Sequence, residues 1–193
     1  MKLNNKYYIM RHGQAISNVK ELVSCWPEKF YNPLTKIGRQ KAKETAKKLK
    51  NTCAEQGRSI DLIFCSPLLR TKMTAEIVGK ILHIKPKIDK RLREQGAGDF
   101  NGLPFMGMSI FFGERGLRRF KIRPKNGETY IEIKKRMVDF LKDTDKKYKG
   151  KNILIISHEL PILFLSCTVK GIPNKDFYLK REEIGTAELR QLN

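Results

Sequence analysis

Short apolar runs alternate with amphipathic segments along most of this chain. Residues 7–10, 61–65 and 153–156 have the length and the branched or aromatic side chains of buried strands. Segments with helical periodicity lie between and after them, at 37–49, 69–82, 128–147 and 161–169. A short strand at 87–92 and an edge strand at 187–192 complete the expected elements. Because strands that alternate with helices usually pair in parallel, the pattern predicts an α/β fold, a three-layer, doubly wound, mostly parallel sheet with helices on both faces.

Residues 96–126 interrupt this alternation. The segment holds six glycines together with Pro104 and Pro124, and we expect irregular backbone that forms a small cap-like insertion over a site. A chain of 193 residues is long enough for one full core and short for two. No repeat or linker appears, so the expected organisation is one domain over 1–193 with the insertion at about 96–126.

The composition is typical of a globular protein, with 40% hydrophobic and 31% charged residues. No apolar run approaches the ~20 residues that a membrane span needs, and the first residues lack the apolar stretch of a signal peptide. We therefore expect a cytoplasmic protein without a membrane partner. The four cysteines are scattered without a Cys-x-x-Cys pair, which favours reduced structural thiols: Cys25, Cys53, Cys65 and Cys167.

The net charge of +20 is unusual. Such a field attracts anions, whether phosphorylated metabolites, acidic lipid or nucleic acid. The alternative is that ordinary solvated lysines cover the helix faces, and the excess of lysine over arginine favours this interpretation. Basic residues gather at 36–50 and 146–151, but no nucleic-acid-binding module is present. Nucleic acid is therefore an unexpected partner, although the charge does not exclude it.

Polar motifs follow three of the expected strands. They are Arg11-His12-Gly13-Gln14, Ser66-Pro67-Leu68-Leu69-Arg70 and Ser157-His158-Glu159. In open α/β sheets ligands bind beyond the carboxyl ends of the strands, so these segments are expected to meet at one site. The third histidine, His83, lies at the rim of an expected helix and is interpreted as structural.

The residue types in these motifs suit phosphoryl chemistry. The guanidinium forks of Arg11 and Arg70 would each grip two phosphate oxygens. An imidazole is a competent nucleophile near neutral pH, and Gly13, a candidate substrate-binding residue, would allow close approach of the backbone with an unusual φ. His158, when protonated, would neutralise the charge that develops on the phosphoryl oxygens.

Three other interpretations remain open from the residues alone. Two strand-end histidines can have unrelated structural roles, and a lone Arg-His-Gly is common by chance. A metal site fits poorly, since Glu159 is the only candidate ligand beside either histidine. A Ser-His hydrolase also fits poorly, since the chain has no Gly-x-Ser-x-Gly elbow.

Six motifs in order along the chain resemble the histidine phosphatase superfamily, also called the phosphoglycerate mutase-like family. They are Ile9-Met10-Arg11-His12-Gly13-Gln14 with Asn18, Asn-Pro-Leu-Thr-Lys-Ile-Gly-Arg-Gln-Lys-Ala at 32–42, Ser-Pro-Leu-Leu-Arg-Thr-Lys-Met-Thr-Ala at 66–75, Leu92-Arg93-Glu94 with Gly-Asp-Phe-Asn-Gly at 98–102, Gly-Glu-Thr at 127–129, and Ile-Ile-Ser-His at 155–158. Together they cover most of the chain.

The resemblance implies a role for each matching residue. His12 would be the nucleophile that forms a phosphohistidine, with Arg11, Arg70 and His158 as the phosphate pocket. Glu94 would be the general acid that protonates the leaving oxygen and later helps to activate water. Asn18 would lie near the phosphate or the substrate. No metal or other cofactor enters this mechanism. From the residues alone, Glu94 would instead be a surface carboxylate between basic neighbours.

The chain also departs from the family pattern. Glu159 stands where the family usually has glycine, and its carboxylate would either favour a protonated His158 or intrude on the pocket and repel phosphate. Asn101 replaces a commonly acidic residue, and Thr71 and Met73 replace the usual alanine and glutamine. These changes bear on the substrate and the rate, and leave the nucleophile in place.

The segment after Glu94, Gln-Gly-Ala-Gly-Asp, is similar to the compact phosphatase branch and lacks the "ERxYG" continuation of the longer mutases. We therefore expect hydrolysis of a small phosphorylated substrate, with cofactor-dependent phosphoglycerate mutase as the alternative. The alternative from another class is a basic anion- or nucleic-acid-binding protein with decayed catalysis. Six cations in the insertion are expected to bind a second phosphate or carboxylate of the substrate, unless they form a solvated loop: Arg115, Arg118, Arg119, Lys121, Arg123 and Lys125.

Overall fold

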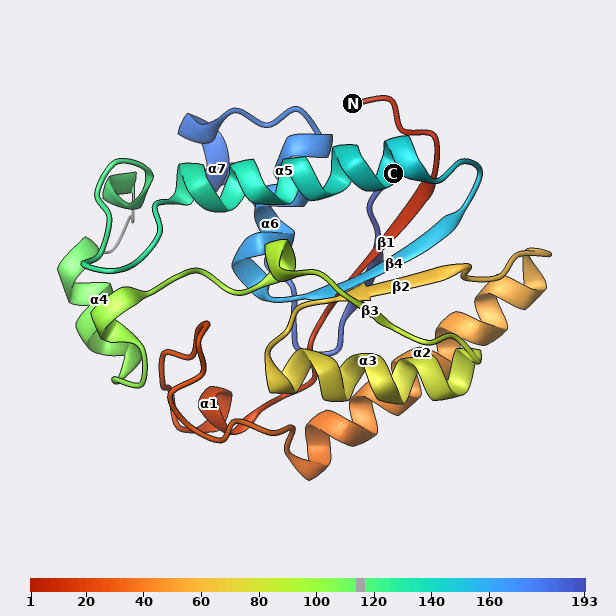
Figure 1. Ribbon diagram of the computed structural model, residues 1–193, viewed down its shortest axis with the longest axis horizontal. Coiled ribbons are helices and arrows are strands. Elements are labelled where there is room, and N and C mark those ends of the chain that lie inside the picture. The colour runs from red at the N-terminus through yellow and green to blue at the C-terminus, as the bar shows by residue number, and fades with distance from the viewer. Residues whose placement is uncertain (114–116) are drawn as a thin grey trace.

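A five-stranded sheet runs through the centre of the molecule, in the computed structural model that describes residues 1–113 and 117–193 (Figure 1). Its order is β3-β2-β4-β1-β5, and β5 alone runs antiparallel, beside β1. The strands are β1 Lys6–Arg11, β2 Leu62–Cys65, β3 Lys87–Ile88, β4 Asn152–Ser157 and β5 Leu189–Gln191. The predicted α/β fold with a mostly parallel sheet is confirmed.

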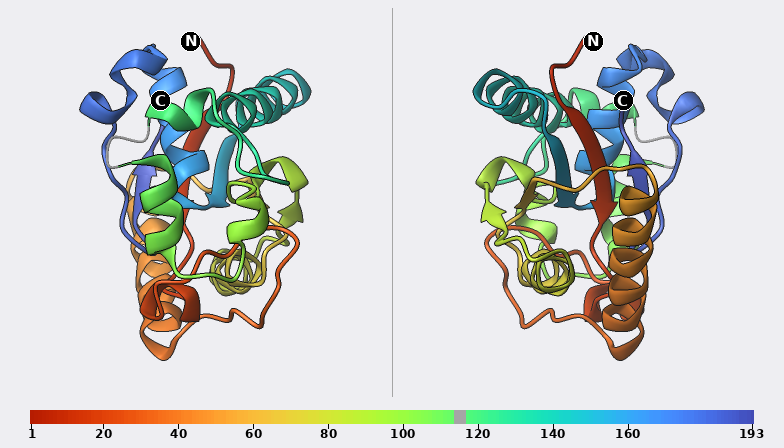
Figure 2. Two further views of the ribbon diagram at one scale, coloured as in Figure 1. Left: turned by 90° about the vertical axis from the view of Figure 1, so that its left-hand side faces the viewer. Right: turned by 90° about the vertical axis from the view of Figure 1, so that its right-hand side faces the viewer.

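Helices cover both faces of the sheet (Figures 1 and 2). On one face lie α2, Lys36–Glu55, and α3, Leu69–Leu82; on the other lie α5, Tyr130–Lys147, and α6, Glu159–Val169. Shorter elements join them: α1 Ile16–Val19, α4 Phe105–Phe112, α7 Phe177–Lys180, and the 3-10 turns η1 Lys90–Leu92, η2 Gly98–Phe100, η3 Leu117–Phe120 and η4 Asn174–Asp176.

Successive side chains of the inner strands enter opposite cores. In β1, Tyr7 and Ile9 pack in the cluster under α5 and α6, whereas Tyr8 and Met10 pack in the cluster under α2 and α3. The residues 153–156 of β4 alternate in the same way and are fully buried. A strand between two helical layers has no polar face, which is why these strands are continuous apolar runs in the sequence.

Capping side chains help to define where the two long helices begin. The Thr35 hydroxyl accepts a hydrogen bond from the Gly38 N–H at 3.0 Å at the start of α2. In α5, Thr129 and Glu132 form a reciprocal capping box. These contacts satisfy backbone N–H groups that the first turn of a helix leaves free, and an N-cap of this kind typically contributes about 1 kcal/mol.

Three expectations for the backbone need correction. The strand expected at 87–92 ends at Ile88, because Asp89 accepts a hydrogen bond from the Arg91 N–H at 2.8 Å and turns the chain into η1. The segment 96–126 is not irregular throughout, since it contains the helix α4. The helix expected at 37–49 continues as α2 to Glu55, with Cys53 extending its buried face.

The carboxyl ends of β1, β2 and β4 meet at one edge of the sheet. Arg11 pairs with Ser157 and Cys65 with Ile156 in the parallel ladder. One residue further, the His12 N–H donates to the Ser157 carbonyl at 3.0 Å. The three polar motifs therefore converge as the sequence predicted.

All four cysteines are buried free thiols. None of the helices in the described ranges combines the length and the apolar character needed to cross a membrane.

Candidate active site

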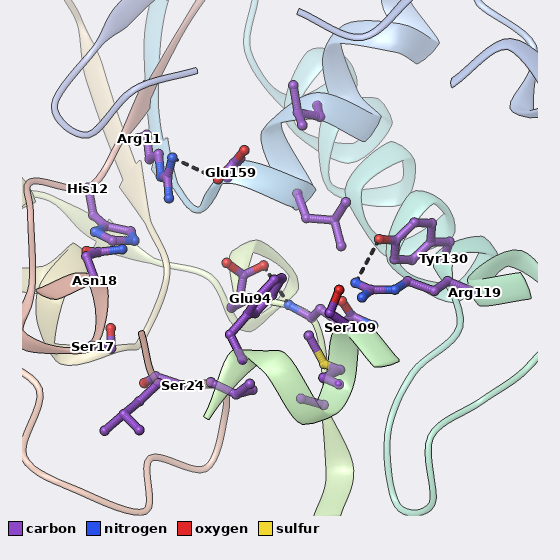
Figure 3. A pocket seen from close by; sticks show the side chains of 18 of the residues that line it. Arg11, His12, Ser17, Asn18, Ser24, Glu94, Ser109, Arg119, Tyr130 and Glu159 are labelled. Atoms are coloured by element: carbon purple, nitrogen blue, oxygen red, sulfur yellow. Dashed lines mark hydrogen bonds and ion pairs between the residues drawn. The ribbon is translucent and has the colours of Figure 1, made fainter. Parts of the chain in front are cut away.

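A cavity of about 390 Å³ opens at the carboxyl edge of the sheet (Figure 3). The sequence-predicted residues that line it are Arg11, His12, Asn18, Arg70 and Glu94. His158 contacts Arg70 and does not itself line the cavity, and Gly13 does not line it either. The structure thus brings five of the seven predicted site residues to one cavity.

His12 follows β1 and is only 2% exposed. Its Nδ1 lies 2.8 Å from the Gly13 carbonyl oxygen, which can only accept, so Nδ1 carries the proton. Nε2 accepts a hydrogen bond from Nε of Arg70 at 3.1 Å and so holds the lone pair. Burial, with the charges of Arg70 and Arg11, lowers the pKa of His12 well below its ordinary value of 6.5. The imidazole is therefore neutral near pH 7, with Nε2 as its nucleophilic atom.

Arg70 lies in the first turn of α3 with its guanidinium fully engaged by protein groups. Besides His12, Nη1 donates to the Ser24 hydroxyl and Nη2 to the Ser24 carbonyl, both at 3.0 Å. Nη1 also lies 3.7 Å from the Glu28 carboxylate. Burial lowers the pKa of Arg70 to about 10, which leaves it charged at neutral pH. A phosphate that bound the fork of Arg70 would therefore have to replace Ser24.

His158 is completely buried behind Arg70. Its Nδ1 accepts from Nη2 of Arg70 at 3.0 Å, so Nε2 carries the proton and donates to the Ser66 hydroxyl at 2.8 Å. Burial and the charge of Arg70 lower the pKa of His158 well below 6.5. The structure favours a neutral His158 over the protonated one considered from the sequence, because desolvation and a neighbouring cation both oppose a second positive charge.

Glu159 enters the cavity and pairs with Arg11. Its Oε2 lies 2.8 Å from Nη1 of Arg11, which also donates to the Ile184 carbonyl at 2.8 Å. The Arg11 Nε is buried and has no hydrogen-bond partner among the described residues. Of the two effects considered for Glu159, the structure supports intrusion on the pocket, because the carboxylate pairs with Arg11 at the cavity.

Asn18 and Gly13 have different relations to the cavity. Asn18 lies beside His12 (Figure 3), and its Oδ1 accepts from the Ala15 N–H at 2.8 Å, which leaves its amide N–H groups as donors. Gly13 has an ordinary φ, so the unusual φ expected there is wrong. Its close approach is to α2 and not to the cavity, since a Cβ on Gly13 would lie 2.5 Å from the Gly38 carbonyl oxygen.

Glu94 lies between His12 and the wall that holds Arg119 and Tyr130 (Figure 3). Its Oε1 accepts from the Gln95 N–H at 2.9 Å, and its Oε2 lies 3.9 Å from Nδ1 of His158. Burial raises the pKa of Glu94 above its ordinary value of 4.5, although the charge of Arg70 opposes this shift. A raised pKa is what a carboxyl group needs to act as an acid near neutral pH.

Sequence reasoning missed a buried arginine that positions Glu94. Arg136 of α5 donates to the Glu94 carbonyl at 3.1 Å and to the Arg91 carbonyl at 2.5 Å. Its Nε lies 3.1 Å from Glu128, whose other carboxylate oxygen accepts from the Gly96 N–H at 2.8 Å. The pair clamps the backbone on both sides of Glu94. An arginine within the apolar stripe of this helix was the signal in the sequence.

Of the six cations expected over the pocket, five lie in the described residues, and one of these five lines the cavity. It is Arg119, beside Tyr130, on the wall opposite His12 (Figure 3). Arg115 lies outside the described residues. The remaining four are exposed to solvent and do not line the cavity: Arg118, Lys121, Arg123 and Lys125.

A neutral histidine and two arginines at the carboxyl edge of an α/β sheet, with a carboxyl group in the same cavity, define an enzyme of the phosphoryl-transfer class. The profile of the histidine phosphatase superfamily (branch 1) matches residues 7–192, and the chain belongs to this family. The resemblance drawn from the sequence motifs is thereby confirmed. The described residues contain no cluster of three or more His, Cys, Asp or Glu that could hold a metal ion.

The relatives in this family include proteins named as phosphatases and proteins named as phosphoglycerate mutases. The chain is 30% identical over 165 residues to "Uncharacterized phosphatase PhoE" of Bacillus subtilis, and the match covers 84% of this chain and 76% of that protein. It is 27% identical over 172 residues to "Probable phosphoglycerate mutase GpmB" of Yersinia pestis, and the match covers 86% of this chain and 75% of that protein.

Solved structures share the fold. YhfR of Bacillus stearothermophilus superposes with a TM-score of 0.81 at 23% identity, over 96% of this chain and 89% of that one. A mycobacterial glucosyl-3-phosphoglycerate phosphatase in complex with VO3 superposes with a TM-score of 0.79 at 23% identity, over 96% and 90% of the two chains.

Proposed function

We propose that this protein is a phosphomonoester hydrolase that acts on a small phosphorylated substrate through a phosphohistidine on His12. The observation that carries the proposal is the state of His12: a buried neutral imidazole whose Nε2 lone pair is held 3.1 Å from Nε of Arg70. A phosphoryl group attracted by Arg70 is thereby brought to the nucleophilic atom. The named phosphatases among its relatives support the same reaction.

In the first step, the Nε2 lone pair of His12 forms a bond to phosphorus while the bond from phosphorus to the alcohol oxygen breaks. The leaving oxygen takes its proton from the carboxyl group of Glu94. The new imidazolium keeps its Nδ1 proton, which is donated to the Gly13 carbonyl. Arg11 and Arg70 balance the charge on the phosphoryl oxygens, an electrostatic contribution that dominates phosphoryl transfer.

In the second step, the Glu94 carboxylate takes a proton from water, and the water oxygen attacks phosphorus. The bond from phosphorus to Nε2 breaks and its electron pair returns to His12. Orthophosphate leaves, and Glu94 is again protonated for the next cycle. A carboxyl group whose pKa is raised by burial suits both halves of this cycle, because it must give and take a proton near neutral pH.

Turnover of p-nitrophenyl phosphate in the presence of a chelator, by wild type and by His12→Ala, tests the proposal. We expect chelator-resistant release by the wild type and a loss of about 10³-fold or more in the variant. His83→Ala, which changes an exposed histidine at the end of α3, is the control. Activity that survives in His12→Ala, or that is lost in the chelator, would contradict the mechanism.

Phosphoglycerate mutase is the second candidate, favoured by the 27% identity to the relative named GpmB. A mutase must retain its intermediate and exclude water from the phosphohistidine. Interconversion of 2- and 3-phosphoglycerate, measured beside orthophosphate release from the same compounds, separates the two. Release without interconversion supports the hydrolase.

We also propose that the protein works in the cytoplasm. Four buried free thiols suit a reducing compartment.

A further inference from the structure

The wall of the cavity opposite His12 is built around an arginine held between aromatic rings. The guanidinium of Arg119 lies 4.6 Å from the ring centroid of Phe112 and 5.8 Å from that of Tyr130. Its Nη1 donates to the Tyr130 hydroxyl at 3.1 Å. The side chain is only 9% exposed, and its Nε has no hydrogen-bond partner among the described residues.

A second arginine joins this wall from the end of α7. The guanidinium of Arg181 lies 4.8 Å from the ring centroid of Tyr178, which in turn stacks on Tyr130 at 6.4 Å between centroids. Arg181 also lines the cavity. The two cations thus flank a pair of stacked tyrosines, and both guanidinium groups border the same cavity as His12.

Removing a charged guanidinium from water is unfavourable unless an anion or hydrogen-bond acceptors replace the lost hydration. Two aromatic faces and one neutral hydroxyl offset only part of the cost of removing Arg119 from water, since cation–π contacts contribute about 0.5–2 kcal/mol each. No carboxylate of the described residues lies within ion-pair distance of Arg119, and Arg181 has only the exposed Glu183 at 3.5 Å. An anion in the cavity would supply the missing partner.

The space between this wall and the phosphoryl end is lined by both apolar and polar side chains. Met108 of α4 and Leu160 and Leu163 of α6 contribute apolar surface, and Glu94, Gln95 and Ser109 contribute polar groups. The cavity has cations at its two ends, with Arg11 and Arg70 at one and Arg119 and Arg181 at the other. A molecule that fills it would have an anionic group at each end and a short uncharged chain or ring between them.

We infer that Arg119 and Arg181 form a second anion-binding subsite, which selects phosphomonoesters whose non-reacting end bears a carboxylate or a second phosphate. This inference rests on the proposed hydrolase function and specifies its substrate class. Arg118 is the natural reference for it, because this adjacent arginine of η3 is exposed to solvent and outside the cavity. General attraction of anions by the +20 charge would act through Arg118 as well as Arg119, whereas the subsite includes Arg119 and not Arg118.

The experiment uses paired substrates. Phosphate esters of ω-hydroxy-alkanoic acids with two to six carbons are compared with their carboxamides, and alkanediol bisphosphates with the corresponding monophosphates. Orthophosphate release is measured for wild type, Arg119→Gln, Arg181→Gln and the control Arg118→Gln. We expect wild type to prefer one length of anionic ester over its neutral twin in kcat/KM. This preference should fall about 10- to 100-fold in Arg119→Gln, the range expected for hydrogen bonds to a charged group, and remain in Arg118→Gln.

A preference for the carboxylate esters over their carboxamides, or for the bisphosphates over the monophosphates, identifies which anion the subsite binds. Equal turnover of charged and neutral twins at every length would overturn the inference, as would a preference that Arg118→Gln also removes. If near-UV circular dichroism shows that Arg119→Gln does not fold, Arg181→Gln, at a partly exposed residue, decides in the same way. No release from any ester, the carboxamides included, would mean that the proposed hydrolase function itself has failed.

Discussion

The carboxylate of Glu159 lies 2.8 Å from the guanidinium of Arg11, at the cavity that holds His12. One strand and one helix bring this pair together, since Arg11 ends β1 and Glu159 begins α6. The contact opposes phosphate binding in the proposed reaction, because Glu159 already pairs with Arg11, one of the two arginines that would bind a phosphoryl group. It also offers a means of testing how the pocket recognises phosphate.

Glu159→Gln should tighten the binding of phosphate. Removing the carboxylate frees Arg11 and removes a repulsion of about 1 kcal/mol at this partly exposed position. We expect the inhibition constant of orthophosphate and the KM of p-nitrophenyl phosphate to fall about 3- to 10-fold. Glu44→Gln on the exposed face of α2 removes the same charge outside the cavity and should change neither. Equal effects of the two substitutions would show that only net charge matters.

Glu94→Gln should affect substrates according to their leaving groups. An alkyl phosphate needs a proton on its leaving oxygen and should lose about 10²-fold or more in kcat, whereas p-nitrophenyl phosphate, whose leaving group is acidic, should lose far less in the first step. In the wild type, alkyl phosphate turnover should decrease as the pH rises through the raised pKa of Glu94, because the acid is then ionised. Pre-steady-state release of the alcohol across pH 4–8 measures this. Identical losses for both substrates would rule out Glu94 as the proton donor.

The stability of the fold should decrease in mild acid. The pKa values of His12 and His158 are lowered in the folded protein, so between pH 7 and 5 the unfolded chain, with histidine pKa values of about 6.5, binds more protons than the folded one. The free energy of unfolding should therefore fall with decreasing pH, by up to about 1.4 kcal/mol per pH unit for each histidine.

Urea unfolding of wild type and of the His12→Gln/His158→Gln variant at pH 5, 6 and 7 measures this slope. The double variant should show a shallower decrease, whatever its absolute stability. A double variant with the full wild-type slope would assign the acid sensitivity to other groups.

Gly38→Ala should destabilise the fold and reduce activity together. A Cβ at Gly38 would lie 2.1 Å from the Gln14 carbonyl oxygen, so α2 and the loop after His12 would have to separate. We expect a loss of about 1–3 kcal/mol, the usual cost of overpacking. Gly107→Ala in α4 meets no atom within 4 Å and should be neutral or stabilising by up to about 1 kcal/mol. Thermal unfolding of the two variants provides the comparison, and equal melting temperatures would contradict it.

Much of the architecture could be predicted because it depends on local pattern. The helix at 69–82 has the predicted limits, and the buried strands are the apolar runs. The prediction was weakest where side chains from distant segments direct the backbone. The turn at Asp89 and the helix α4 within a glycine-rich segment are examples, since the buried face of α4 depends on Val23 and Cys25 from another loop.

For the candidate site too, the sequence predicted some features and not others. His12, Arg70 and His158 could be located from their positions just after three strands, because the carboxyl ends of neighbouring parallel strands meet at one edge. The protonation states and the pairing of these side chains could not be predicted, because pKa values depend on burial and on charges that are near in space and not in sequence. Burial and the charge of Arg70 lower the pKa of His158 for this reason, and Arg136, 42 residues from Glu94, was missed.

The fold class, the family and the identity of the chemical groups follow from the sequence alone, since hydrophobic periodicity and ordered motifs are properties of neighbouring residues. Which of two adjacent arginines lines the cavity depends on the folded structure. Arg118 and Arg119 have the same side chain and nearly the same sequence context, yet one is solvated and the other lies between Phe112 and Tyr130. The energy of a charge depends on what surrounds it in space, and packing between distant segments sets those surroundings.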